Sequence, residues 1–261
     1  MKMRIRIIVF RWLNMISFLA MIAVNIAAER RLLGGKTTGE ISAQYPVLIT
    51  PAGYAFLIWT VIYILLLLYV VYGFTKAGQE SKVNQAICHL FFVSCLLNIG
   101  WLVAWHYERL ASSVFLMLVL LFTLITIHIR TKDTMREPAA PSDKWLVRLP
   151  FRIYLGWISV AVIVNIAVAL YASNWDRFGL SETAWAIIML SVAVLLAIIV
   201  VVKERNIVFA AVFIWAICAI GVKQLAYPAV AYTSFAYALA LIVALCWIVE
   251  VRCTLAAQRD V

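Results

Sequence analysis

Aromatic and amide side chains recur at helical spacing in three long apolar stretches of the chain. Ser94, Asn98, Trp101 and Trp105 follow one another at steps of four, three and four residues, which places them on one face of a helix. Indoles offer flat apolar walls to a flat ligand, and an amide can hydrogen-bond its polar edge. The residues that could line one such site are Trp59, Tyr63, Asn98, Trp101, Trp105, Tyr154, Trp157 and Asn165. Spacing alone leaves a second interpretation open, in which the Trp and Tyr residues form interfacial belts and the Asn residues join neighbouring helices.

Residue types that would indicate catalysis or metal binding are scattered along the chain. His89 and His128 fall toward one end of their apolar stretches and His106 toward the opposite end, so we expect no shared metal site. The five cysteines form no CxxC pair, and no carboxylate pair lies within an apolar stretch. We expect no metal and no catalytic residues. The sequence leaves enzymatic activity undecided and favours its absence.

The elements that must position these side chains are membrane spans. The 261 residues are 66% hydrophobic and 13% charged, against about 25% charged residues in an average soluble domain. Mean hydropathy is +1.01. The fold class predicted is all-α, a polytopic helical membrane protein. Eight apolar segments are expected at 7–28, 52–75, 85–106, 111–129, 149–172, 183–202, 207–222 and 229–249, and the seventh is the weakest because it is short.

The net charge of +10 reflects membrane topology rather than nucleic-acid binding, because the basic residues lie at the ends of the apolar segments. With the N-terminus inside, 16 of the 22 basic residues fall on the cytoplasmic side. This bias predicts that both termini are cytoplasmic. Residues 130–148 are then a polar cytoplasmic linker. The Gly- and Pro-bearing residues 29–51 lie outside, as either a lid or a plain connector.

Three motifs in these segments resemble the TspO/MBR family, the translocator proteins or tryptophan-rich sensory proteins. They are Pro51-x7-Trp59-Thr60-x-x-Tyr63, Leu97-Asn98-x-x-Trp101, and Tyr154-x-x-Trp157-x7-Asn165. One departure is Ile153, which stands where the family has a proline. The resemblance implies a TspO-like five-helix bundle over residues 1–172. Residues 173–261 would then be a C-terminal transmembrane extension of about three helices.

The resemblance also implies a function. The expected protein is a receptor or sensor in a bacterial plasma membrane that binds a tetrapyrrole, such as haem or protoporphyrin IX, in an aromatic pocket. Arg30, Arg31 or Arg109 could meet the ligand's carboxylates at the mouth of this pocket. The alternatives are a transporter of porphyrins or other hydrophobic small molecules and, third, a porphyrin-degrading enzyme. The expected partners are membrane lipid and the hydrophobic ligand, with a homodimer as an option and no nucleic acid.

Overall fold

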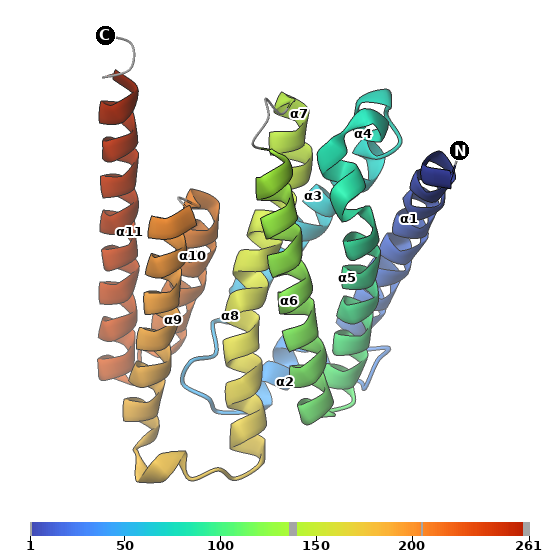
Figure 1. Cartoon of the computed structure of the whole chain (residues 1–261). Coiled ribbons are helices and arrows are strands. Elements are labelled where there is room, and N and C mark those ends of the chain that lie inside the picture. The colour runs from blue at the N-terminus through green and yellow to red at the C-terminus, as the bar shows by residue number, and fades with distance from the viewer. Residues whose placement is uncertain (1, 136–139, 205, 258–261) are drawn as a thin grey trace. The chain divides into compact units, whose positions relative to one another are not determined.

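The computed structural model of the chain consists of helices, and it describes residues 2–135, 140–204 and 206–257 (Figure 1). No strand occurs in those three ranges. Seven helical segments among them are long and apolar enough to cross a membrane. They are Ile8–Glu29, Gly53–Tyr72, Lys82–His106, Leu110–Thr134, Pro141–Ala172, Glu182–Glu204 and Pro228–Ile248. The predicted fold class, an all-α polytopic membrane protein, is confirmed.

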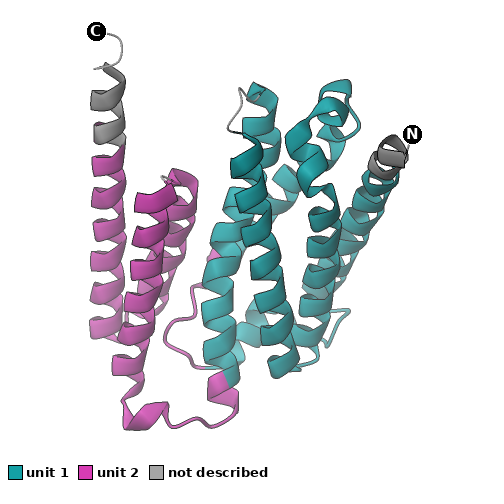
Figure 2. Cartoon of the chain, in the orientation of Figure 1, with its two compact units in different colours: residues 1–45, 56–169 teal, residues 46–55, 170–261 magenta. Residues whose placement is uncertain are grey.

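One compact unit comprises residues 1–45 and 56–169 (Figure 2). Its elements are α1 (Lys2–Glu29), α2 (Thr38–Gln44), α3 (Ile58–Tyr72), α4 (Lys76–Glu80), α5 (Lys82–His106), α6 (Leu110–Thr134), α7 (Pro141–Asp143), the π-helix η2 (Lys144–Arg148) and most of α8 (Leu149–Ala172). Helix α5 packs against both α1 and α6, and α1 also packs against α3. Because α5 has partners on two sides, side chains on its inner faces are removed from lipid.

Local sequence explains where these helices begin and end. The predicted span 52–75 starts as a 3-10 turn, η1 (Gly53–Leu57), and its α-helix ends at Tyr72. The Ser81 hydroxyl caps α5 by accepting a hydrogen bond from the Asn84 backbone N–H at 3.1 Å. The same hydroxyl donates to the buried Asp143 carboxylate at 2.7 Å, and Tyr72 donates to that carboxylate at 3.0 Å. The acidic end of α7 therefore joins the end of α3 to the start of α5.

The predicted cytoplasmic linker 130–148 is mostly helical where the structure describes it. Helix α6 continues to Thr134, and α7 with η2 fills residues 141–148. Linker residues 136–139 lie outside the described residues. Three basic residues that contribute to the predicted orientation, Arg136, Arg205 and Arg259, also lie outside them. The orientation stays a prediction.

The second compact unit comprises residues 46–55 and 170–261, with α9 (Glu182–Glu204), α10 (Ile207–Lys223) and α11 (Pro228–Ala257) packed against one another (Figure 2). Helix α10 has 17 residues, so it measures about 25 Å against about 30 Å of bilayer core. This short helix is the segment 207–222 that the sequence marked as the weakest span.

Residues 46–55 belong to this second unit through hydrogen bonds to α10. The Ala52 N–H donates to the Ala219 carbonyl at 3.1 Å, and the Trp215 indole N–H donates to the Ala55 carbonyl at 3.2 Å. The Tyr54 ring meets the Trp215 ring edge to face at 5.4 Å between centroids. The compact units follow packing within the chain. The predicted boundary between residues 172 and 173 separates the part of the chain expected to match a five-helix family member from the expected extension. This boundary stays a prediction.

Candidate functional site

A chain of hydrogen-bonded polar side chains crosses the inside of the first unit and joins four helices. Tyr63 on α3 donates from its hydroxyl to the Asn25 amide oxygen on α1 at 2.6 Å. The Asn25 amide nitrogen donates to the Asn98 amide oxygen on α5 at 3.1 Å. The Asn98 amide nitrogen then donates to the Tyr154 hydroxyl on α8 at 3.2 Å. Asn98 and Tyr154 are both 0% exposed, so the bond between them satisfies two buried polar groups.

Next to this polar chain, the Trp59 ring lies at the centre of an aromatic cluster. Its centroid is 5.3 Å from Tyr63 and 6.0 Å from Trp101, with near-parallel rings at interplanar angles of 18° and 28°. It meets Tyr154 at 5.9 Å and Trp157 at 6.4 Å, both edge to face. These separations fall in the range that aromatic pairs prefer. We call Trp59, Tyr63, Trp101, Tyr154 and Trp157 the aromatic cluster.

Two indole N–H groups of the aromatic cluster are buried without an acceptor. They belong to Trp101 and Trp157, whose side chains are 4% and 2% exposed. A buried donor that makes no hydrogen bond costs about 1–3 kcal/mol, and buried Trp residues usually find a partner. The two orphan donors belong to rings on α5 and α8 that both contact the Trp59 ring. They indicate where an acceptor from a ligand would be favoured.

The remaining candidate residues from the sequence lie at the edge of the aromatic cluster or away from it. Trp105 stacks on Trp101 at 6.4 Å, but its indole N–H already donates to the Thr38 carbonyl at 3.3 Å. The Asn165 amide oxygen accepts a hydrogen bond from the Ser113 hydroxyl at 3.1 Å. Asn165 thus joins α8 to α6, two helical turns beyond Trp157. Six of the eight candidates, namely Trp59, Tyr63, Asn98, Trp101, Tyr154 and Trp157, meet in one place, and Trp105 adjoins them.

Two residues of the site were not among the candidates. Asn25 bridges Tyr63 and Asn98, and the available signal was an amide within an apolar span, which must find a protein partner. Phe56, in the 3-10 turn η1, meets the Trp157 ring edge to face at 5.9 Å. No spacing signal marks Phe56, because the turn interrupts the helical periodicity of α3.

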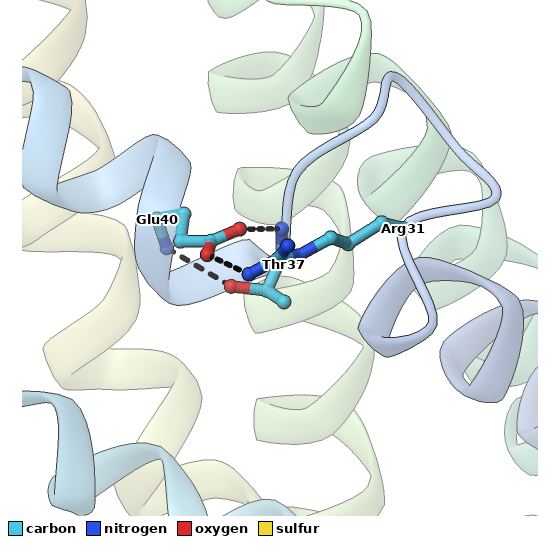
Figure 3. A network of polar contacts seen from close by, with 3 residues as sticks. All are labelled: Arg31, Thr37 and Glu40. Atoms are coloured by element: carbon cyan, nitrogen blue, oxygen red, sulfur yellow. Dashed lines mark hydrogen bonds and ion pairs between the residues drawn. The ribbon is translucent and has the colours of Figure 1, made fainter.

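The first half of the predicted outer loop folds into an ordered element. Thr37 and Glu40 form a reciprocal capping box at the start of α2, in which the Glu40 N–H donates to the Thr37 hydroxyl at 3.2 Å (Figure 3). The Glu40 carboxylate also accepts from the Thr37 backbone N–H at 2.8 Å and pairs with Arg31 at 2.5 Å. The Thr37 N–H, followed by the Arg31 charge, lowers the pKa of Glu40.

The same loop is attached to the turn between α5 and α6. The Glu108 carboxylate accepts hydrogen bonds from the Tyr45 hydroxyl at 3.0 Å and from Lys36 at 3.2 Å, and these bonds lower its pKa. Burial and the bond to Glu108 raise the pKa of Tyr45. Gly34 adopts a left-handed φ of 62°, and a Cβ there would overlap the His106 carbonyl oxygen. The loop therefore covers the end of α5 where Trp105 and Trp101 lie.

A protein-family model described as TSPO-like protein matches residues 11–247, from within α1 to within α11. No curated protein and no solved structure matches the chain. The match covers nearly all of the predicted five-helix bundle, residues 1–172, and it continues through α9 and α10, so the resemblance is confirmed over most of the chain. The motif residues Trp59, Asn98 and Trp157 meet in the site described above. The chain belongs to the TSPO-like family and is an integral membrane protein, for which the family suggests sensing or ligand binding.

Proposed function

We propose that the protein is a membrane receptor or sensor that binds a flat, hydrophobic ligand of the tetrapyrrole class in the aromatic cluster. The observation that carries this proposal is the pair of buried indole N–H donors of Trp101 and Trp157, which have no acceptor and whose rings both contact Trp59. An apolar site with a few convergent polar groups is the usual form of a small-molecule pocket. Tetrapyrroles combine flat apolar faces with carboxylate or carbonyl acceptors at their edge.

The ligand would enter by replacing ring contacts of Trp59. The Trp59 side chain is half-buried, whereas Trp101, Trp157 and Tyr154 are buried. Rotation of the Trp59 indole would replace its contacts with other rings by contacts with the ligand. The apolar area buried around the indole would change little. The polar chain through Asn25 and Asn98 would hold the surrounding helices in place. The ligand therefore meets a rigid wall on α5 and α8 and an adaptable wall on α3.

Basic residues at the loop end of the unit suit the carboxylates of such a ligand. Arg31 is engaged by Glu40 at 2.5 Å, and Lys36 is engaged by Glu108 at 3.2 Å. Arg30 and Arg109 are exposed at the same end of the unit. A carboxylate that binds there would remain near water while the macrocycle lies in the aromatic cluster, which costs less than burial of the charge. The anchored loop with α2 would then act as the lid of the site.

Titration of the purified protein with protoporphyrin IX tests this proposal through quenching of Trp fluorescence. The Trp157→Phe variant keeps a ring and removes the orphan donor, so we expect affinity to fall about fivefold, as for the loss of one neutral hydrogen bond of about 1 kcal/mol. Trp145→Phe is the matched control, because the Trp145 side chain is 67% exposed and lies in η2. Equal affinity in Trp157→Phe and the parent would overturn the assignment of the site.

The alternatives are separated by two further measurements on the same protein. A transporter would move protoporphyrin IX into proteoliposomes at a rate that depends on Trp59, whereas a sensor would only bind it. A degrading enzyme would remove the porphyrin absorbance band and yield a matching product. We expect binding without flux and without loss of the absorbance band.

A further inference from the structure

Three aromatic rings form a patch at the start of α9 and in the turn that precedes it, within the second unit. The Trp175 ring meets the Phe178 ring at 5.1 Å and the Trp185 ring at 4.7 Å between centroids, in both cases edge to face. Phe178 is 79% exposed, and the two Trp side chains are half-buried. Exposed rings that cluster, unlike single ones, are typical of a surface that contacts a partner or a membrane. We call these three residues the loop patch.

The backbone of the turn holds Phe178 in a conformation that an aromatic residue rarely adopts. Arg177 and Phe178 have left-handed φ angles of 59° and 55°, which are unfavourable for any residue with a Cβ and especially for a bulky one. Asp176 closes the turn, because its carboxylate accepts from the Phe178 N–H at 3.1 Å and its carbonyl accepts from the Gly179 N–H at 3.0 Å. The turn thus projects the Phe178 ring outward at a cost in backbone strain, which burial of the ring away from water would offset.

The loop patch is attached to the ends of two candidate membrane spans. Trp175 is three residues beyond the span Pro141–Ala172, and its N–H donates to the Leu170 carbonyl in the last turn of α8 at 3.2 Å. Trp185 is the fourth residue of the span Glu182–Glu204, so it lies about 5 Å inside the end of that span. In Figure 1 the turn lies at the N-terminal end of α9. The loop patch therefore lies where hydrocarbon meets headgroups, the depth at which indole rings concentrate.

The charges beside the loop patch favour apolar contact with the bilayer over attraction to anionic headgroups. Residues 173–185 contain one basic residue, Arg177, and two acidic residues, Asp176 and Glu182, which gives a net charge of −1. Arg177 also pairs with Glu182 at 3.8 Å. Anionic lipids attract clusters of basic residues, and this segment has none. The acyl chains that surround the adjoining spans are the apolar partner already present beside the exposed ring.

We propose that the loop patch is a membrane anchor, in which the Phe178 ring inserts among the acyl chains just below the phospholipid headgroups. Trp175 and Trp185 lie at the level of the lipid esters, where an indole N–H meets an ester carbonyl and the ring stays in apolar surroundings. The anchor fixes the depth at which α9 begins in the bilayer. Insertion of the ring also explains why an exposed phenylalanine is retained at a left-handed position.

A fluorine probe at Phe178 tests where this ring lies. In the full-length protein, 4-trifluoromethylphenylalanine replaces Phe178, and the protein is placed in nanodiscs of dioleoyl-phosphatidylcholine. Fluorine NMR then measures relaxation caused by O₂, which concentrates among acyl chains, and by a gadolinium chelate, which stays in water. The same probe at Leu195, 59% exposed within the span Glu182–Glu204, and at Gln44, exposed on α2 outside the candidate spans, supplies the two references.

We expect the ratio of the O₂ effect to the gadolinium effect at Phe178 to be closer to that at Leu195 than to that at Gln44. The ratio should be the same at low and high salt, because the contact is apolar. A ratio closer to that at Gln44 would place the ring in water. Weak effects of both reagents would show that protein, such as a second copy of the chain, covers the ring. Either result would overturn the proposal.

Two substitutions with the same number of side-chain atoms separate lipid contact from backbone strain. Phe178→Asn suits a left-handed φ but loses the apolar side chain, whereas Phe178→Leu stays apolar but fits that φ poorly. Hydrogen exchange of residues 173–181 in the same nanodiscs reports opening of the turn. We expect exchange to be several-fold faster in Phe178→Asn than in Phe178→Leu, while residues 29–37 exchange alike in both variants. Equal or slower exchange in Phe178→Asn would overturn the anchor, because strain rather than lipid would then control the turn.

Discussion

Replacement of Asn98 by leucine tests whether the polar chain across the first unit exists as described. Leucine has the same branching and the same number of side-chain heavy atoms as asparagine, so the change mainly removes hydrogen bonds. Asn98 makes two bonds to other helices, one with Asn25 and one with Tyr154. Hydrogen bonds between helices in membranes contribute about 0.6 kcal/mol each on average and up to about 1.7. We therefore expect Asn98→Leu to lower the free energy of unfolding by about 1–3 kcal/mol.

A double-mutant cycle isolates one of these bonds. Tyr154→Phe removes the hydroxyl that accepts from Asn98, and Asn98→Leu removes the donor. If the bond is present, the double variant is less destabilised than the sum of the single variants, by about 0.6–1.7 kcal/mol. Reversible unfolding in mixed micelles, followed by circular dichroism, measures all four proteins. Tyr63 and Asn25 form the bond at the other end of the chain, and the same cycle applies to that pair.

The control cycle pairs Asn98→Leu with Asn165→Leu. Asn165 bonds to Ser113, shares no partner with Asn98, and lies 11 residues, or about 16 Å along α8, beyond Tyr154. Its effect should add to that of Asn98→Leu within about 0.5 kcal/mol. Additive effects for Asn98 and Tyr154 as well would refute the hydrogen bond between them and the positions of α5 and α8 that it implies.

Three further predictions concern the loop that covers the end of α5. Thr37→Ala removes the cap of α2 and should cost about 1 kcal/mol of stability in thermal melts, whereas Thr37→Ser should retain most of it. Gly34→Ala should lower the melting temperature, since its left-handed φ and the His106 carbonyl leave no room for a Cβ, and an unchanged melting temperature would argue against this loop position. The lowered pKa of Glu108 stabilises the fold at pH values above the ordinary glutamate pKa of 4.5, and this contribution is lost as the pH falls through the lowered value. In unfolding measurements between pH 7 and pH 3, Glu108→Gln should remove part of this acid sensitivity, and an identical pH profile would contradict the assignment.

Much of the fold follows from the sequence because the bilayer imposes a length and a composition on each span. The segments 85–106 and 183–202 lie within α5 and α9, and the short 207–222 reappears as α10. The sequence says less where packing decides. The 3-10 turn ahead of α3 and the ordered helix α2 depend on contacts that hydropathy does not encode.

The site was predictable to the extent that its residues carry a periodic signal. Helical spacing and the three motifs single out Trp59, Asn98 and Trp157, which the structure brings together. Asn165 satisfied the same spacing, yet its amide bonds to α6, because spacing defines a helix face but not the neighbour that covers it. Asn25 was not a candidate, although it belongs to the site in the structure. The sequence shows only a single amide within a span, and its partner depends on which helices pack against each other.

We propose that the orphan indole N–H groups of Trp101 and Trp157 bind the ligand. Solution NMR of protein labelled with ¹⁵N at the Trp indoles tests this directly, with Phe substitutions to assign each signal. On addition of protoporphyrin IX, the indole N–H resonances of Trp101 and Trp157 should shift as they acquire an acceptor and come close to the ring current of the macrocycle, while that of Trp145 should stay in place. Binding of the porphyrin with both resonances unchanged would show that these two N–H groups do not bind it.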